Sequence, residues 1–108
     1  MKHRIEIVPR QGHRLFNSLV RREMELSRKN RGTFFRRGRK AKNKARWQHK
    51  RYAGWLSLER TAGEGATVEV NVRRGQGTDW QLLQAFIGFV VRNFGDQVGA
   101  MHIQFSAR

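Results

Sequence analysis

The stretch that most limits how this chain can fold is residues 28–51, RKNRGTFFRRGRKAKNKARWQHKR, called the basic segment below. It holds twelve Lys or Arg side chains and no Asp or Glu. Like charges at this density repel one another in a compact interior, so we expect the basic segment to lie at the surface. Because only 38% of the chain is apolar, the hydrophobic core then has to come from the two ends of the sequence.

Alternating apolar and polar residues predict four strands, which cover residues 4–8, 52–60, 67–73 and 100–106. Pro9 ends the first strand, because proline cannot donate a hydrogen bond inside a sheet. The Gly-rich residues 61–66 predict a hairpin loop between the second and third strands. We expect the apolar strand positions to face one core: Ile5, Ile7, Leu56, Leu58, Val68, Val70, Val72, Met101, Ile103 and Phe105.

Two stretches, residues 12–29 and 78–94, have the period of an amphipathic helix. The first carries an apolar stripe made by Leu15, Phe16, Leu19, Val20 and Met24. The second begins with Thr78 as its N-cap, and Gln81 three residues later completes a capping box. This second helix is apolar over more than one stripe. Either the domain covers it on several sides, or it meets a second copy of the chain in a homodimer.

The predicted order is strand, helix, strand, strand, helix, strand. Two split βαβ units in this order predict an α+β sandwich, the ferredoxin-like βαββαβ fold. Right-handed crossovers would place its two helices on one face of a four-stranded antiparallel sheet. A fold of the double-stranded-RNA-binding type, α-β-β-β-α, is the alternative if the first strand is misplaced. We expect a single domain over residues 1–108, with the basic segment inserted between the first helix and the second strand.

The charge of the basic segment sets the expected function. The chain carries a net charge of +15, of which only +3 remains without this segment. Nucleic acid is the commonest partner for such a stretch, because each cation placed on a phosphate releases a bound counterion. We expect an electrostatic contact of low sequence specificity that favours RNA or single-stranded DNA, because aromatic rings are interleaved with the cations. The predicted nucleic-acid-binding residues are Arg28, Lys29, Arg31, Arg36, Arg37, Arg39, Lys40, Lys42, Lys44, Arg46, Trp47, Lys50 and Arg51, with Trp47 as the stacking ring. Outside this set, Trp55 is a candidate platform for one base at the edge of the sheet.

Two other functions compete with this one. A toxin-like ribonuclease would use two histidines as general acid and base, and His49 and His102 are the most plausible pair. An interaction module would instead bind an acidic protein partner through the basic segment. An RNA-recognition motif does not fit, because the strand positions that would need aromatic rings hold Glu6, Glu69 and Asn71. We therefore assign no catalytic residue and expect a protein that is not an enzyme.

No metal or cofactor is expected, because the acids are scattered singly and the chain has no cysteine. The Gly-rich residues 74–77 precede the second helix, where backbone amides with Arg73 and Arg74 would form a secondary anion site. The N-terminus lacks the pattern of a signal peptide, and no run of about 18 apolar residues occurs. We therefore expect a cytoplasmic protein without a membrane span.

Overall fold

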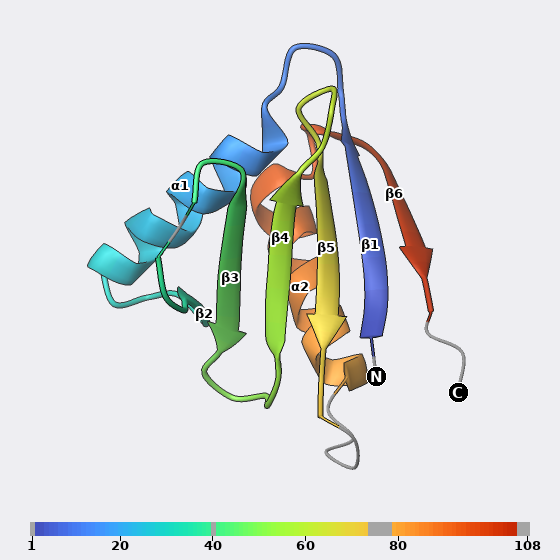
Figure 1. Ribbon diagram of the computed structural model, residues 1–108. Helices are drawn as coiled ribbons and strands as arrows, with labels where there is room; N and C mark the ends of the chain where they lie inside the picture. The colour runs from blue at the N-terminus through green and yellow to red at the C-terminus, as the bar shows by residue number, and fades with distance from the viewer. Residues whose placement is uncertain (1, 40, 74–78, 106–108) are drawn as a thin grey trace.

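The computed structural model describes residues 2–39, 41–73 and 79–105 of the chain. In chain order the elements are β1 (Lys2–Pro9), α1 (Leu15–Arg28), β2 (Phe34–Arg36), β3 (Lys44–His49), β4 (Trp55–Arg60), β5 (Ala66–Asn71), α2 (Asp79–Phe94) and β6 (Val98–Gln104). Within the described residues, six strands form one sheet in the order β2-β3-β4-β5-β1-β6, and all neighbouring strands are antiparallel. Figure 1 shows α1 and α2 behind this sheet, with β2 and β3 on one side and β6 at the other edge.

Alternation along the central strands decides which face of the sheet meets the helices. Ile5 and Ile7 on β1 are buried, and the register places Ile5 opposite Val68 of β5. The same register places Leu56 of β4 opposite Val70 of β5. Because side chains alternate along a strand, these apolar residues share one face. The polar residues between them point to the opposite side, called the open face below.

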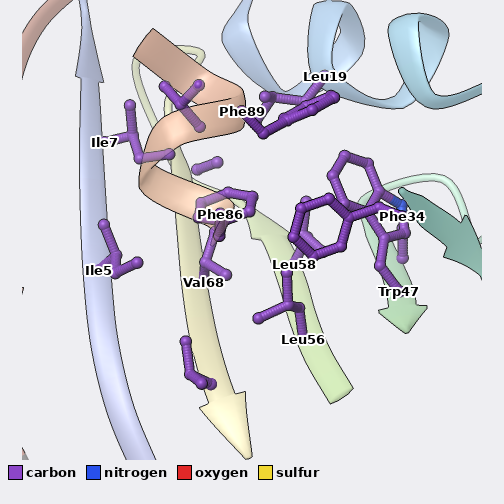
Figure 2. Close-up of a cluster of buried hydrophobic side chains, with 14 of the residues drawn as sticks. Ile5, Ile7, Leu19, Phe34, Trp47, Leu56, Leu58, Val68, Phe86 and Phe89 are labelled. Carbon is purple, nitrogen blue, oxygen red and sulfur yellow. The ribbon is translucent and has the colours of Figure 1, made fainter. Parts of the chain in front are cut away.

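The helices close the apolar face with large side chains. Figure 2 shows Phe86 and Phe89 of α2 and Leu19 of α1 lying over the strand residues. The ring of Trp47 on β3 lies 5.9 Å from that of Phe34, 6.2 Å from Phe86 and 5.6 Å from Phe89, measured between centroids. Aromatic pairs at such distances contribute about 0.5–1.5 kcal/mol each beyond the burial of their area. This cluster therefore fixes β2 and β3 to the rest of the fold.

The prediction of a four-stranded ferredoxin-like fold is wrong. The described residues form a six-stranded sheet, because two parts of the basic segment become β2 and β3. β3 pairs with β4 so that Trp47 lies opposite Leu56, which extends the sheet beyond the four expected strands. The double-stranded-RNA-binding alternative is wrong as well, since β1 precedes α1 and pairs with both β5 and β6.

The expectation that the core comes only from the ends of the chain is also wrong. Phe34, Ala45 and Trp47 of the basic segment are buried, with exposed fractions of 2%, 6% and 0%. Lys44 and Arg46 alternate with them along β3 and are exposed. A strand near the margin of a sheet can send cations to water on one face and apolar side chains into the core on the other. The self-repulsion of the segment therefore does not prevent it from folding.

The four predicted strands and both predicted helices are confirmed, with shifted bounds. The helices run over Leu15–Arg28 and Asp79–Phe94, and the predicted cap at Thr78 lies outside the described residues. On β6, Met101 and Ile103 are half-buried and pack against the core. Phe105 is 53% exposed, so its predicted place in the core is wrong. It lies beyond Gln104, the last residue of β6 that pairs with β1.

Helix α2 buries most of its apolar side chains within the chain. The buried ones are Leu82, Leu83, Phe86, Phe89, Val90 and Phe94. Trp80 and Val91 remain exposed, at 47% and 58%. A homodimer through residues 78–94 therefore stays a prediction that depends on these two side chains. Within the described residues, neither helix combines the length and the apolar character that crossing a bilayer requires.

Candidate nucleic-acid interface

The basic segment is tied to the sheet by backbone hydrogen bonds at both ends of β2. The N–H of Arg37, just after β2, donates to the carbonyl oxygen of Arg46 at 2.7 Å. At the other end, the N–H of Lys50 donates to the carbonyl oxygen of Thr33 at 2.9 Å. The loop after β2 and the turn at residues 50–54 therefore start from fixed points, and so do the cations that they carry.

A hollow of about 560 Å³ lies beside β3 and is called the first hollow. Its cations come from β3 and from the loop before it: Arg37, Arg39, Lys44 and Arg46. Lys44 and Arg46 leave β3 on the open face, because Ala45 and Trp47 point into the core. Side chains two residues apart on a strand are separated by about 6.6–6.8 Å. This is close to the spacing of successive phosphates along an extended nucleic-acid strand.

Two carboxylates line the edge of the first hollow that lies nearest the central strands. Glu59 of β4 is the cross-strand partner of Lys44, and Glu69 of β5 also lines the hollow. A carboxylate oxygen of Glu69 lies 3.5 Å from Nζ of Lys2 on β1. The positive potential is therefore strongest at the β2–β3 margin and weakens toward the middle of the sheet.

A second hollow, of about 530 Å³, meets the first at Arg37, which lines both. Its cations are Arg37, Lys50, Arg51 and Arg73. The aromatic residues that line it are Phe35, His49, Tyr52 and Trp55. Of these, His49 has its ring on the side of the helices, 4.9 Å from the ring of buried Phe34. Among the described residues that line it, none is acidic. The second hollow thus combines cations suited to phosphate with flat surfaces suited to a base.

His49 holds the turn that carries Lys50 and Arg51. Its Nδ1 accepts hydrogen bonds from the backbone N–H groups of Arg51, at 3.0 Å, and Tyr52, at 3.3 Å. The two rings of His49 and Tyr52 are stacked, with centroids 4.7 Å apart. Burial, and next the charge of Arg51, lower the pKa of His49 below its ordinary value of 6.5. The imidazole is therefore neutral at neutral pH, and Nδ1 stays available as an acceptor.

The structure gathers part of the predicted binding set and separates the rest. The predicted cations that line a hollow are Arg37, Arg39, Lys44, Arg46, Lys50 and Arg51. Those exposed at the end of α1 and in the following turn, which line neither hollow, are Arg28, Lys29 and Arg31. Arg36 pairs with Trp47 and so leaves β2 on the side of the helices. Lys42 is exposed in the loop before β3, and Lys40 lies outside the described residues.

The assignment of Trp47 as the stacking ring is wrong. Its side chain is fully buried, and its indole packs against rings of β2 and α2. Trp47 alternates with Arg46 and Gln48, so it faces the helices while they face the open side. A base cannot reach this ring while the fold is intact.

Of the aromatic residues that do line a hollow, Trp55 is the candidate platform named from the sequence, whereas Phe35 and Tyr52 are not among the predicted binding residues. Phe35 pairs with Gln48, and both lie on the side opposite buried Phe34. The signal was present in the alternation of residues 44–49, which requires Gln48 to face outward once Trp47 is placed inside. Arg73, just after β5, was considered only for the secondary anion site. The remainder of that site, residues 74–77, lies outside the described residues.

The histidines considered for ribonuclease chemistry are not brought together. His49 is on β3 and His102 on β6, and β4, β5 and β1 lie between them. At about 4.8 Å per strand, this separation is roughly 19 Å. A general acid and a general base must both reach one phosphodiester, so this pair does not form such a site. In the described part of the chain, no group of three His, Cys, Asp or Glu side chains is placed to hold a metal ion.

No protein-family model, no curated protein and no solved structure matches this chain. Its function therefore has to be inferred from the arrangement of its own side chains.

Proposed function

We propose that this protein binds nucleic acid through the first and second hollows, by electrostatic contacts of low sequence specificity. RNA or single-stranded DNA is the favoured polymer. The observation that carries the proposal is the gathering of cations from one segment around two hollows that join at Arg37. A nucleic-acid strand can follow this joined surface with its phosphates against the cations.

The number of cations that contact phosphates predicts how steeply the affinity falls with salt concentration. Six phosphate contacts correspond to a slope of roughly −4 to −5 in a plot of log affinity against log salt concentration. The cations that line the hollows are mostly Arg, whose planar guanidinium suits phosphate oxygens better than an ammonium does. Phosphate contacts carry no sequence information, which is why we expect low specificity.

The proposal also includes a cytoplasmic location. The chain contains no cysteine. Such a composition fits a reducing compartment, where disulfides do not form.

The proposal is tested by fluorescence anisotropy with labelled RNA, single-stranded DNA and duplex DNA of about eight nucleotides, a length within the range bound by small domains. Titrations at about 50 and 200 mM salt give the salt slope. The variant Arg37→Glu/Arg46→Glu reverses two cations, one of which lines both hollows. The matched control, Arg21→Glu/Arg92→Glu, makes the same change of charge at exposed positions on the two helices.

We expect binding that weakens steeply with salt and is lost in Arg37→Glu/Arg46→Glu but largely retained in the control. An equal loss in both variants would mean that total charge, rather than the hollows, drives binding. If none of the three polymers binds at physiological salt, the proposal fails. The next experiment is then a pull-down for an acidic protein partner of the basic segment.

A further inference from the structure

We propose that the second hollow is a pocket for one unpaired nucleobase, so that the natural ligand is a single strand with accessible bases. This inference rests on the proposed function and names the ligand class of the same site. The two hollows differ in the residues that line them. The first has two acids and no aromatic residue among its described lining residues, whereas the second has four aromatic residues and no acid.

The spacing of the strands leaves room for a base between two rings. Phe35 lies on β2 and pairs with Gln48 of β3, and Trp55 begins β4 on the other side of β3. The β3–β4 register ends at the Trp47–Leu56 pair, and the next residue along each strand, Gln48 and Trp55, lines the second hollow. Strands that flank a common neighbour are about 9.6 Å apart. A base inserted midway would lie about 4.8 Å from each ring, within the 4.5–7 Å range of aromatic pairs.

The exposure of Phe35 and Trp55 is consistent with stacking on a base. Phe35 is 36% exposed, in contrast to its buried neighbour Phe34 at 2%. Trp55 is half-buried on the same side of the sheet. Gln48 lies between them, and its amide both donates and accepts hydrogen bonds, so it can meet the edge of a stacked base. The pocket therefore has two stacking walls and a polar floor.

The rim of the second hollow is held in place before any ligand arrives. His49 Nδ1 accepts hydrogen bonds from two N–H groups of the turn that carries Lys50 and Arg51. The backbone of Arg37 is fixed by the hydrogen bond from its N–H to the carbonyl oxygen of Arg46. Because the backbone of the rim needs little rearrangement, less ordering entropy is lost on binding. From Arg37 the strand continues into the first hollow, where Lys44 and Arg46 can contact the next phosphates.

A paired base does not fit this pocket. Inside a duplex both faces of each base are already stacked, so entry would require the nucleotide to be flipped out, at a cost of a few kcal/mol. The inference therefore separates two classes of ligand that electrostatics alone would treat alike. Single strands should gain from the second hollow, and duplexes should not.

The experiment compares four labelled ligands: a single strand of about eight nucleotides, its duplex, the same strand with abasic sugars in place of nucleosides, and a free mononucleotide. The variants are Phe35→Leu and Trp55→Leu, which leave the charge unchanged. Trp80→Leu is the control, because Trp80 is also exposed but lies on α2, packed against His3. Trp55→Phe keeps a ring at the same position, and thermal melting followed by circular dichroism checks the fold of each variant.

We expect each Leu variant at the pocket to weaken single-strand binding by about 5- to 150-fold, the loss of one base–aromatic stack. Binding of the duplex and of the abasic strand should be unchanged, Trp55→Phe should restore most of the affinity, and Trp80→Leu should have no effect. In the wild type, single-strand binding should also quench tryptophan emission, and this quenching should disappear in Trp55→Phe but persist in Trp80→Phe. The quenching reports on the pocket even if a Leu variant folds poorly.

Any of three results would overturn the pocket. The first is that duplex and single strand bind equally well, and the second is that the ring variants weaken the binding of both to the same extent. The third is that the free mononucleotide binds as tightly as the strand. In the first two cases salt-sensitive binding persists, so the proposed function stands while the base pocket fails. If no polymer binds at all, the proposed function itself has failed.

Discussion

Nε2 of His3 on β1 donates a hydrogen bond of 2.8 Å to Oδ2 of Asp79, the first residue of α2. Both residues are buried, with exposed fractions of 1% and 2%. The rings of Trp80 and Phe105 lie beside the imidazole, with centroids 5.2 and 5.7 Å away. An acidic side chain in the first turn of a helix also interacts favourably with the helix dipole. This contact therefore joins the start of the first strand to the start of the last helix.

We expect His3→Ala and Asp79→Ala each to lower the free energy of unfolding by about 3 kcal/mol, because each leaves a buried polar group without this partner. The double variant should cost less than the sum of the two, with a coupling of about 0.5–3 kcal/mol. Urea denaturation of the four proteins gives this coupling. Strictly additive losses would mean that the two side chains stabilise the fold independently.

Trp47 provides a test of the buried aromatic cluster. Its Nε1–H is buried without a hydrogen-bond partner among the described residues. Trp47→Ala should cost about 3–5 kcal/mol through the cavity that it leaves. Trp47→Phe should cost clearly less, because it also removes an unsatisfied donor whose burial costs about 1–3 kcal/mol. Denaturation midpoints measure both, and folded Trp47→Phe should retain full affinity for nucleic acid. A large loss of affinity would reinstate Trp47 as a binding residue.

The regular alternation of the central strands made much of the secondary structure predictable. In residues 67–73 every second residue is valine, and Val68 and Val70 are fully buried as expected. The apolar stripe of α1 behaves in the same way, with Leu15, Phe16 and Leu19 buried. In these stretches local pattern and tertiary packing demand the same conformation, so the sequence alone is sufficient.

The charge density of the basic segment predicts a surface position, and this prediction is wrong for its apolar residues. In residues 44–49 only Ala45 and Trp47 are apolar, and the cations between them hide the period of two. β2 is three residues long and has too few positions to show a pattern. What stabilises both strands is tertiary: the packing of Phe34 and Trp47 against rings of α2. Contacts between residues so distant in the sequence are not visible in local composition.

The candidate site was predictable as a set of cations but not as a surface. Composition located the charge in residues 28–51, and several of those cations do line the hollows. Which ring meets the ligand depends on which face of β3 points outward, and the pairing of β3 with β4 decides this. The choice between Trp47 and Trp55 is the clearest case, because the sheet buries the first and leaves the second half-buried at the second hollow.

The titration of His49 should make stability depend on pH. Its pKa is lowered in the folded state, so between that value and 6.5 the unfolded chain binds more protons than the folded one. Its contribution to stability is therefore complete above pH 6.5 and is lost as the pH falls through the folded pKa. His49→Asn retains an acceptor for the N–H groups of the turn but does not titrate. Urea denaturation from pH 8 to pH 5, about the range over which histidine titrates, should show a loss in the wild type that is smaller in His49→Asn. Parallel curves would remove His49 as the cause.

Gly54 should be intolerant of a side chain, because the backbone is in a conformation that favours glycine and no space is left. Its φ is +107°, and an added Cβ would lie 2.5 Å from the carbonyl oxygen of Asn71 and 2.9 Å from Cγ2 of Val72. Gly38 is the matched control, since its φ is +72° but nothing lies within 4 Å of a Cβ there. We expect Gly38→Ala to cost about 1 kcal/mol from the backbone alone. Gly54→Ala should cost about 3 kcal/mol or more, from strain and overlap together. Equal denaturation midpoints would show that the turn before β4 relaxes freely.

The two carboxylates of the first hollow should oppose nucleic-acid binding. Glu59 lies across from Lys44, and a carboxylate oxygen of Glu69 lies 3.5 Å from Nζ of Lys2. Replacing either by Gln keeps the shape and removes one negative charge near the phosphates. We expect a gain in affinity of about two- to fivefold for Glu59→Gln, the size of one partly exposed charge interaction. The gain should be smaller for Glu69→Gln, because Lys2 already neutralises part of that charge. Both gains in affinity should shrink as the salt concentration rises from about 50 to 200 mM, since screening weakens exposed charge interactions.

Asp96→Asn is the control for this comparison, because it removes one negative charge from the exposed turn between α2 and β6. If affinity depended only on net charge, all three variants would gain equally. If the strand instead lay over the helices or the β6 edge, Glu59→Gln would gain no more than Asp96→Asn. A larger and salt-sensitive gain at Glu59 alone would place the phosphates beside Lys44, because that is the cation its carboxylate faces.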